Sequence, residues 1–515
     1  METAQARDQE RNQTRRWIAV GALLSVLMRL RMFWSPVSVD EGGYLAIARA
    51  WAHGDVLYRD VWVDRPQGLL VLFRVWDWLS GGSTASIRIM AMLFGVLLVV
   101  STATIVRELV GSAAARWTAI VCGVVSSSPV LEAHAANGEL LSGAVSAAGL
   151  ALAVLALSKQ RPLRWFFASG VLAGLALSLK QSGFDGLLAI AMWLLACAVF
   201  LPHSRRASVR YLGALIAGLC CVLAALMIHG ALTGWSRWWT AVAGYRLRYG
   251  SAFAAANWGN LAQTSRFALA VLGTTAVVAI APAVLIVRGV RARRTMHLPR
   301  RAVVLVVWAG LSVVAFLVGG GFWRHYWLLI AAPTSALAGV GLSRVGRYKP
   351  IVLAALLAPC LAVSVWVFAG DTGSINVRAA GDRRSIVDQQ VAKWFISHRQ
   401  VGDNMYVLCA SAAAYADAHQ DPGYPYLWRT EVLHAPNSQR LLVEYLADSK
   451  RAPRFIAQYQ SSSACDVSGR VRRILCVGYH RVALVDHIPI LERNYSRANL
   501  AHPCKNTIRP FALAG

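Results

Sequence analysis

The sequence predicts an α-helical protein that crosses a membrane about eleven times and ends in a polar α/β domain. The first observation is composition: of 515 residues, 57% are hydrophobic and only 15% are charged. With a mean hydropathy of +0.47, this is the composition of a polytopic membrane protein rather than of a soluble domain. The second observation is the repetition of apolar runs long enough to cross about 30 Å of hydrocarbon.

We expect the first predicted span to be retained, because its apolar run leads into Arg29 and Arg31 rather than a small-residue cleavage site. A long polar loop, 38–85, follows it. The remaining spans follow one another to about residue 369. The full set of predicted spans is 17–37, 86–106, 114–132, 138–157, 165–181, 184–201, 211–231, 264–287, 302–319, 327–343 and 350–369.

Charge predicts the orientation of these spans. The loops that alternate with outer turns are all basic, namely 107–116, 159–164, 203–210, 288–301 and 344–349. Basic loops face the cytoplasm, so we expect a protein of the cytoplasmic membrane with its N-terminus inside. The loops 38–85 and 232–263 and the tail then lie outside. These loops account for much of the net charge of +27, and no signature of nucleic-acid binding accompanies it.

The polar tail predicts a separate domain. We expect a transmembrane catalytic domain at 1–369, which includes the loop 38–85, and an extracytoplasmic domain at 370–515. Helical spacing of apolar residues predicts a helix at 383–398, and short apolar runs predict strands at 404–409, 454–457 and 481–485. An external location permits a disulfide. Cys465 and Cys476 are the nearest pair in the tail, but Cys409 and Cys504 leave the connectivity open.

The first outer loop concentrates ionisable residues. Between residues 39 and 68 lie the side chains Asp40, Glu41, Asp55, Asp60, Asp64 and Arg65, in a chain with 25 acidic residues. Carboxylates held between apolar spans are usually functional. The spacing of Tyr44, Ile47, Ala48 and Trp51 predicts an amphipathic helix lying in the membrane interface.

This helix would hold Asp40 and Glu41 at its positive end. An alternative role for Asp40 is simply to cap the helix.

Several motifs together resemble a known group of enzymes. The loop contains DE at 40–41, LYRD at 57–60 and DRPQG at 64–68, and later stretches are ANGELL (136–141), GLALSLKQSG (174–183), GGGFWRHYWLLIAAP (319–333) and YPYLW (424–428). In their order and predicted topology, these motifs resemble the GT-C glycosyltransferases of the protein O-mannosyltransferase and lipid A aminoarabinose transferase type, families 39 and 83.

The resemblance implies a function. Such enzymes transfer a sugar, with inversion, from a polyprenyl-phosphate carrier to an acceptor hydroxyl at the outer membrane face. By this resemblance Asp40 is the general base with Glu41 beside it, Asp64 and Arg65 contact the lipid phosphate, and Glu139 is the second acidic position. Arg65 stands where the aminoarabinose transferases have Lys, and a guanidinium also binds phosphate.

Other basic or aromatic side chains on the outer side would stabilise the departing phosphate. They are Lys180, Arg246, Arg248, Arg324, His325 and Tyr326. The Trp-rich segment that precedes Arg246 is equally typical of an aromatic belt at the membrane surface.

The sequence leaves several alternatives open. A divalent-metal site is one open alternative, with Glu132, His134 and Glu139 as its ligands, although their spacing matches no recognised ligand pattern. No other cofactor is expected. A transporter or flippase of lipid-linked sugars is the alternative function, but it would place its ionisable groups near the midplane and show related halves. The acceptor is a lipid, a polysaccharide or a protein, and the expected partners are this acceptor, the lipid-linked donor and the membrane.

Overall fold

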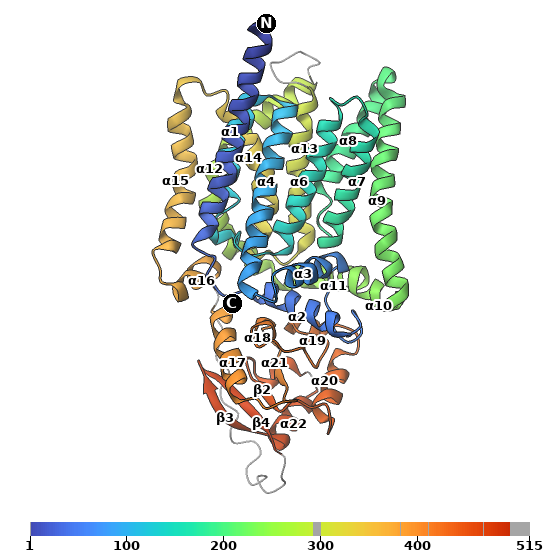
Figure 1. Ribbon diagram of the computed structural model, residues 1–515, viewed down its shortest axis with the longest axis vertical. Helices are drawn as coiled ribbons and strands as arrows, with labels where there is room; N and C mark the ends of the chain where they lie inside the picture. Colours follow the sequence, from blue (N-terminus) through green and yellow to red (C-terminus); the bar gives the residue numbers. More distant parts are fainter. Residues whose placement is uncertain (1, 292–299, 382, 410, 467, 495–515) are drawn as a thin grey trace.

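The structure, a computed structural model, describes residues 2–291, 300–381, 383–409, 411–466 and 468–494. It has three layers (Figure 1). A bundle of long helices forms one end, a small α/β domain forms the other, and the short helices of the first loop run across the end of the bundle between them.

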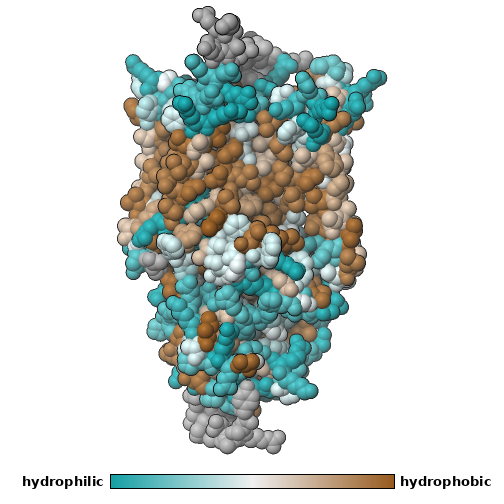
Figure 2. Space-filling view, in the orientation of Figure 1, coloured by the Kyte–Doolittle hydropathy of each residue, from teal (hydrophilic) through white to brown (hydrophobic). Residues whose placement is uncertain are grey.

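The predicted spans coincide with helices of the bundle. These are α1 (Glu2–Leu30), α4 (Ile87–Leu109), α5 (Ser112–Val125), α6 (Gly138–Ala156), α7 (Pro162–Leu179), α8 (Asp185–Phe200), α9 (Arg205–Thr233), α12 (Trp258–Arg291), α13 (Val303–Gly319), α14 (Leu328–Leu342) and α15 (Lys349–Phe368). In the described parts of the chain, eight helices are long and apolar enough to span a membrane; α5 and α8 are shorter apolar helices. On the face shown in Figure 2, an apolar belt crosses the bundle, with polar side chains above and below it.

Small residues let neighbouring helices of the bundle approach closely. A Cβ added to Gly21 of α1 would lie 2.3 Å from the carbonyl oxygen of Ala119, and one added to Gly123 of α5 would lie 2.3 Å from that of Gly21. Contacts of this kind drive association where lipid replaces water.

A charged side chain of α1 is buried against the rest of the bundle. Arg29, near the end of α1, is 1% exposed. Its guanidinium donates to the Ala133 carbonyl at 2.7 Å, to the Ser126 carbonyl at 2.9 Å and to the Ser127 hydroxyl at 2.5 Å. Arg29 therefore fastens α1 to the turn that follows α5.

The middle layer begins with α2 (Val39–His53), which the sequence predicted. Its N-cap is Ser38, whose side chain accepts from the Glu41 N–H while the Glu41 carboxylate accepts from the Ser38 N–H. This capping box means that Asp40 is not the cap. The expectation of a helix lying on lipid is also wrong, because every residue from Glu41 to Ala50 is buried.

The next helix has the lipid-facing character instead. On α3 (Gln67–Leu79), Val71, Val75, Trp78 and Leu79 are exposed while Leu69 and Leu70 are buried. The layer is completed by α10 (Trp235–Trp239) and α11 (Tyr245–Ala256), joined by a π-helical turn at Thr240–Gly244.

The C-terminal domain packs helices against a four-stranded sheet. The strands are β1 (Met405–Val407), β2 (Phe455–Ala457), β3 (Tyr479–Val485) and β4 (Ile488–Arg493), in the order β1-β2-β4-β3. β1 and β2 are parallel and the other pairs antiparallel. The helices are α16 (Thr372–Ala380), α17 (Arg384–His398), α18 (Ala413–Asp417), α19 (Arg429–His434), α20 (Ser438–Ala447), α21 (Ser462–Cys465) and α22 (Arg470–Gly478).

The predicted tail helix and three strands are confirmed, whereas β4 was missed. Pro489 argued against a strand there, and the hairpin turn between β3 and β4 uses Asp486 and His487, both with positive φ (41° and 69°), instead of the usual Asn-Gly signal.

The disulfide joins Cys409 to Cys465, not Cys465 to Cys476. Cys504 lies outside the described residues.

Candidate functional site

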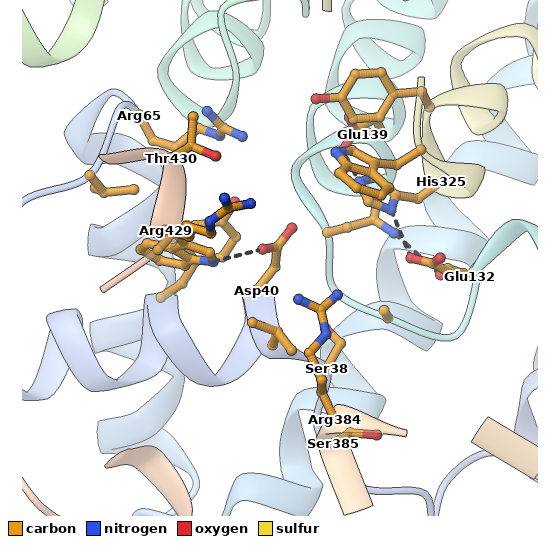
Figure 3. Close-up of a pocket in the computed structure, with 18 of the residues that line it drawn as sticks. Ser38, Asp40, Arg65, Glu132, Glu139, His325, Arg384, Ser385, Arg429 and Thr430 are labelled. Carbon is orange, nitrogen blue, oxygen red and sulfur yellow. Dashed lines mark hydrogen bonds and ion pairs between the residues drawn. The ribbon is translucent and has the colours of Figure 1, made fainter. Parts of the chain in front are cut away.

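A cavity of about 520 Å³ lies where the three layers meet. The bundle contributes Glu132, His134, Asn137, Glu139, His325 and Tyr326, the first loop contributes Ser38, Asp40, Tyr44, Asp64 and Arg65, and α11 contributes Tyr245 and Arg246. The C-terminal domain contributes Arg384, Ser385, Trp428, Arg429, Thr430, Glu431 and Gln460. All three layers therefore build one site (Figure 3).

Asp40 projects into the middle of this cavity (Figure 3). It is the second residue of α2, and because Ser38 caps the helix, the Asp40 side chain is not consumed by the backbone. Its Oδ1 accepts a hydrogen bond from the indole Nε1 of Trp428 at 3.2 Å. The arrangement leaves a carboxylate facing the open volume, as a proton acceptor requires.

Glu41 has a different environment from its neighbour. Its carboxylate accepts from the Arg88 guanidinium at 2.7 Å, from the Ala136 N–H at 2.7 Å and from the Ser38 N–H at 2.8 Å. It is fully buried and does not line the cavity. The expectation of a catalytic role is therefore not supported for Glu41. Its hydrogen bonds to Arg88 and Ala136 instead hold α2 to the bundle.

Two guanidinium groups share one carboxylate at the arginine end of the cavity. Asp64 forms ion pairs with both Arg65 and Arg246. Burial raises the pKa of Asp64, but attraction to Arg246 and Arg65 outweighs burial, so the pKa lies below its ordinary value. The main chain is also fixed, because Tyr58 donates to the Arg65 carbonyl at 2.9 Å and Gln181 to the Asp64 carbonyl at 2.9 Å. With two guanidiniums and one carboxylate, this group of three side chains keeps one net positive charge.

A second charged cluster lines the bundle side. Glu139, in the first turn of α6, pairs with Lys180, whose ammonium also lies 4.2 Å from the centre of the Tyr326 ring. His325 bonds Glu132 through Nδ1 at 2.7 Å, and its Nε2 lies 3.8 Å from Glu139. Figure 3 shows this cluster across the cavity from Arg65, with Asp40 between them.

Three of the predicted basic residues do not line the cavity. Lys180 lies behind Glu139. Arg324 stacks on Phe267 at 3.8 Å and donates to the Ala379 carbonyl at 2.6 Å, so it supports α16. Arg248 is exposed on α11. Its neighbour Arg246, two residues earlier, points inward to Asp64.

The sequence did not identify the contribution of the C-terminal domain. The only sequence signal was the YPYLW motif, which ends at Trp428. No motif marked Arg384, Arg429 or Glu431 as site residues. Glu431 is 5% exposed, and its Oε2 has no hydrogen-bond partner in the described structure. Burial and, next, repulsion from Asp64 raise the pKa of Glu431 well above its ordinary value.

The possible ion site is not assembled. Glu132 is bound to His325 and Glu139 to Lys180, while burial and then repulsion from Arg88 lower the pKa of His134 well below its ordinary value. Within the described ranges, no group of three or more His, Cys, Asp or Glu side chains is arranged to hold a metal.

Comparisons with known proteins give one family segment and a set of related folds. A family model described as dolichyl-phosphate-mannose-protein mannosyltransferase matches residues 64–228. No curated protein sequence matches the chain.

Solved structures match almost the whole chain. ArnT from Cupriavidus metallidurans bound to undecaprenyl phosphate is 13% identical, with a TM-score of 0.58 over 94% of this chain and 98% of that one. The same protein in the apo state is 15% identical, with a TM-score of 0.60 over 92% of this chain and 97% of that one. The oligosaccharyltransferase AglB from Archaeoglobus fulgidus, in complex with an inhibitory peptide and a dolichol-phosphate, is 13% identical. Its TM-score is 0.54, over 96% of this chain and 75% of that one.

Proposed function

The chain has the fold of the GT-C membrane glycosyltransferases, and from that premise we propose that it transfers a sugar from a polyprenyl-phosphate donor to an acceptor hydroxyl, with inversion. The observation that carries the proposal is Asp40, held inside a cavity whose arginine end has two guanidiniums for one carboxylate. The undecaprenyl phosphate and dolichol-phosphate bound in the related structures agree with such an anion site.

The proposed chemistry is a single displacement. Asp40 accepts the proton of the acceptor hydroxyl as that oxygen attacks the anomeric carbon. The bond between the anomeric carbon and the phosphate oxygen breaks at the same time, and polyprenyl phosphate leaves. Arg65 and Arg246 stabilise the negative charge that grows on the phosphate. Because one nucleophile displaces one leaving group, the configuration at the anomeric carbon inverts.

The proposed orientation puts the cavity on the outer face of the cytoplasmic membrane. The basic loops at the end of the bundle away from the cavity support it, since such loops face the cytoplasm. In this orientation residues 1–369 form the transmembrane catalytic domain, and residues 370–515 form an extracytoplasmic domain that covers the cavity.

The first experiment identifies the donor. Deleting the gene should cause a lipid-linked sugar to accumulate, and its mass gives the sugar and the polyprenol. If no lipid-linked sugar accumulates and the purified protein transfers none, the proposal is wrong.

The second experiment tests the base. Asp40→Asn should lower turnover of that donor by about 10²- to 10⁴-fold while the protein still inserts and folds. Asp55→Asn is the matched control, since Asp55 lies in the same loop but not in the cavity lining. Unchanged turnover in Asp40→Asn would reject the assignment.

A further inference from the structure

The C-terminal domain docks on α2 through two consecutive glycines. A Cβ on Gly42 would lie 2.4 Å from the Cα of Ala413, which is in α18. A Cβ on Gly43 would lie 2.4 Å from Cζ2 of Trp428 and 2.9 Å from Cβ of Ala412. Any side chain at either position would push the domain away from the helix.

Neither glycine is needed for the local backbone conformation. Both lie within the first turns of α2, and neither has a positive φ. Glycine inside a helix is unfavourable relative to alanine. The close approach of Ala413 and Trp428 therefore explains why glycine occupies both positions.

Trp428 is held firmly where it meets α2. Its segment is tied to the first loop by a hydrogen bond from the Trp62 N–H to the Pro425 carbonyl at 3.0 Å. The Trp428 ring centre lies 5.8 Å from that of Tyr44, and the Trp428 carbonyl accepts from the N–H groups of Glu431 and Val432 in α19, each at 3.0 Å. The indole thus reaches Asp40 as part of a fixed assembly.

The indole N–H is the one hydrogen-bond donor found on the Asp40 carboxylate in the described structure. Indole is a donor only, so it cannot take over as a base. It fixes one oxygen of the carboxylate and leaves Oδ2 for the proton of the acceptor hydroxyl.

We propose that Trp428 is a positioning residue for the catalytic carboxylate, so that the docked C-terminal domain sets the orientation of Asp40. This inference rests on the proposed function. It makes the domain part of the reaction machinery rather than a cover over the cavity.

The test compares Trp428→Phe in two backgrounds. Phenylalanine keeps an aromatic side chain at the position that packs on Tyr44, but it has no N–H and lacks the outer ring atoms that touch Gly43. In the full-length enzyme, Trp428→Phe should lower kcat about 10-fold with little change in the KM for the accumulated lipid-linked donor. In the Asp40→Asn background the same substitution should change the residual kcat very little, because a residue acting through Asp40 has no effect once the base is gone.

A matched control separates positioning from stability. Trp394→Phe changes an indole of the same domain that stacks on His398, outside the cavity lining. Both single variants should keep the melting temperature of the parent within a few degrees, and Trp394→Phe should keep kcat.

The outcomes distinguish the two proposals. If Asp40→Asn remains fully active, the proposed function loses its base. If Asp40→Asn is impaired but Trp428→Phe has no effect on kcat, or the same effect in both backgrounds, the positioning role is wrong and the base assignment stands. Trp428→Phe that raises KM alone would make Trp428 a substrate contact and would also overturn the proposal.

Discussion

Individual carboxylates of the first loop differ in their partners, and the partners come from distant parts of the chain. Asp40 is bound by Trp428, Glu41 by Arg88 and the Ala136 N–H, and Asp64 by Arg246. The acidic density of the loop was visible in the sequence, and the family motifs singled out Asp40. The burial of Glu41 away from the cavity was not predictable, because it depends on a side chain 47 positions away and a backbone N–H 95 positions away.

The proposed phosphate role of Arg246 can be tested against the nearby Arg248. Arg246→Ala should weaken binding of undecaprenyl phosphate at least about 10-fold, because charge-assisted bonds to phosphate are strong. Arg248→Ala is the control, since Arg248 is exposed. Titration of each purified variant with the lipid measures the effect, and equal losses in both would contradict the assignment.

Glu41 should behave as a structural residue. Glu41→Gln leaves the Arg88 guanidinium buried without its counter-charge, and breaking a buried pair of this kind costs about 3 to 5 kcal/mol. We expect a lower melting temperature, with turnover per folded molecule largely kept. Glu108→Gln, which breaks a more exposed pair with Arg107, should cost under about 1 kcal/mol. A stable but inactive Glu41→Gln would restore the catalytic assignment.

At the scale of elements, periodicity found the helices but not what covers them. The pattern of α2 correctly predicted a helix, and its amphipathic appearance wrongly predicted lipid contact, because α18 and Trp428 supply the apolar partner instead. The strand β4 was hidden by Pro489 and by an unusual turn. The first error arises from a contact between segments far apart in sequence, and the second from local turn and proline chemistry.

One element should make the domain sensitive to pH. Asp388 of α17 is buried and accepts from the Ser411 and Tyr459 hydroxyls, and burial raises its pKa from 3.8 to about 7. The folded state therefore binds this proton more tightly than the unfolded state. Its contribution to stability is full below about pH 4 and is lost as the pH rises through about 7, by about 1.4 kcal/mol per pKa unit.

Melting curves between pH 4 and 8 measure this effect. Asp388→Asn should flatten the dependence, whereas Asp421→Asn, an exposed carboxylate paired with His53, should leave it as in the parent. The role of Asp388 would be contradicted if the melting temperature rose from pH 4 to 7, by the same amount in the parent and in both variants.

At the scale of the whole molecule, hydropathy located the bundle and ordered motifs indicated the GT-C resemblance, which the fold and the family segment confirm. The docking of the C-terminal domain over the cavity was not predictable. The docking depends on close packing against Gly42 and Gly43, and such packing leaves no periodic pattern in the sequence.

The orientation of the molecule can be tested with single cysteines. In intact cells, a membrane-impermeant maleimide should label Val401→Cys, which is exposed on the C-terminal domain. It should label Gln160→Cys, in the exposed turn between α6 and α7, only after the cells are opened. Labelling in the reverse pattern would place the cavity in the cytoplasm.

Arg29 has a consequence for how the chain is made. A guanidinium in an inserting apolar helix is costly, and the groups that bind Arg29, at Ser126, Ser127 and Ala133, are synthesised about a hundred residues later. We therefore expect α1 to settle in the bilayer only when α5 and its following turn leave the ribosome. Nascent chains that stop before residue 126 should integrate α1 less completely than chains that extend past residue 133, and Arg29→Leu should remove the difference.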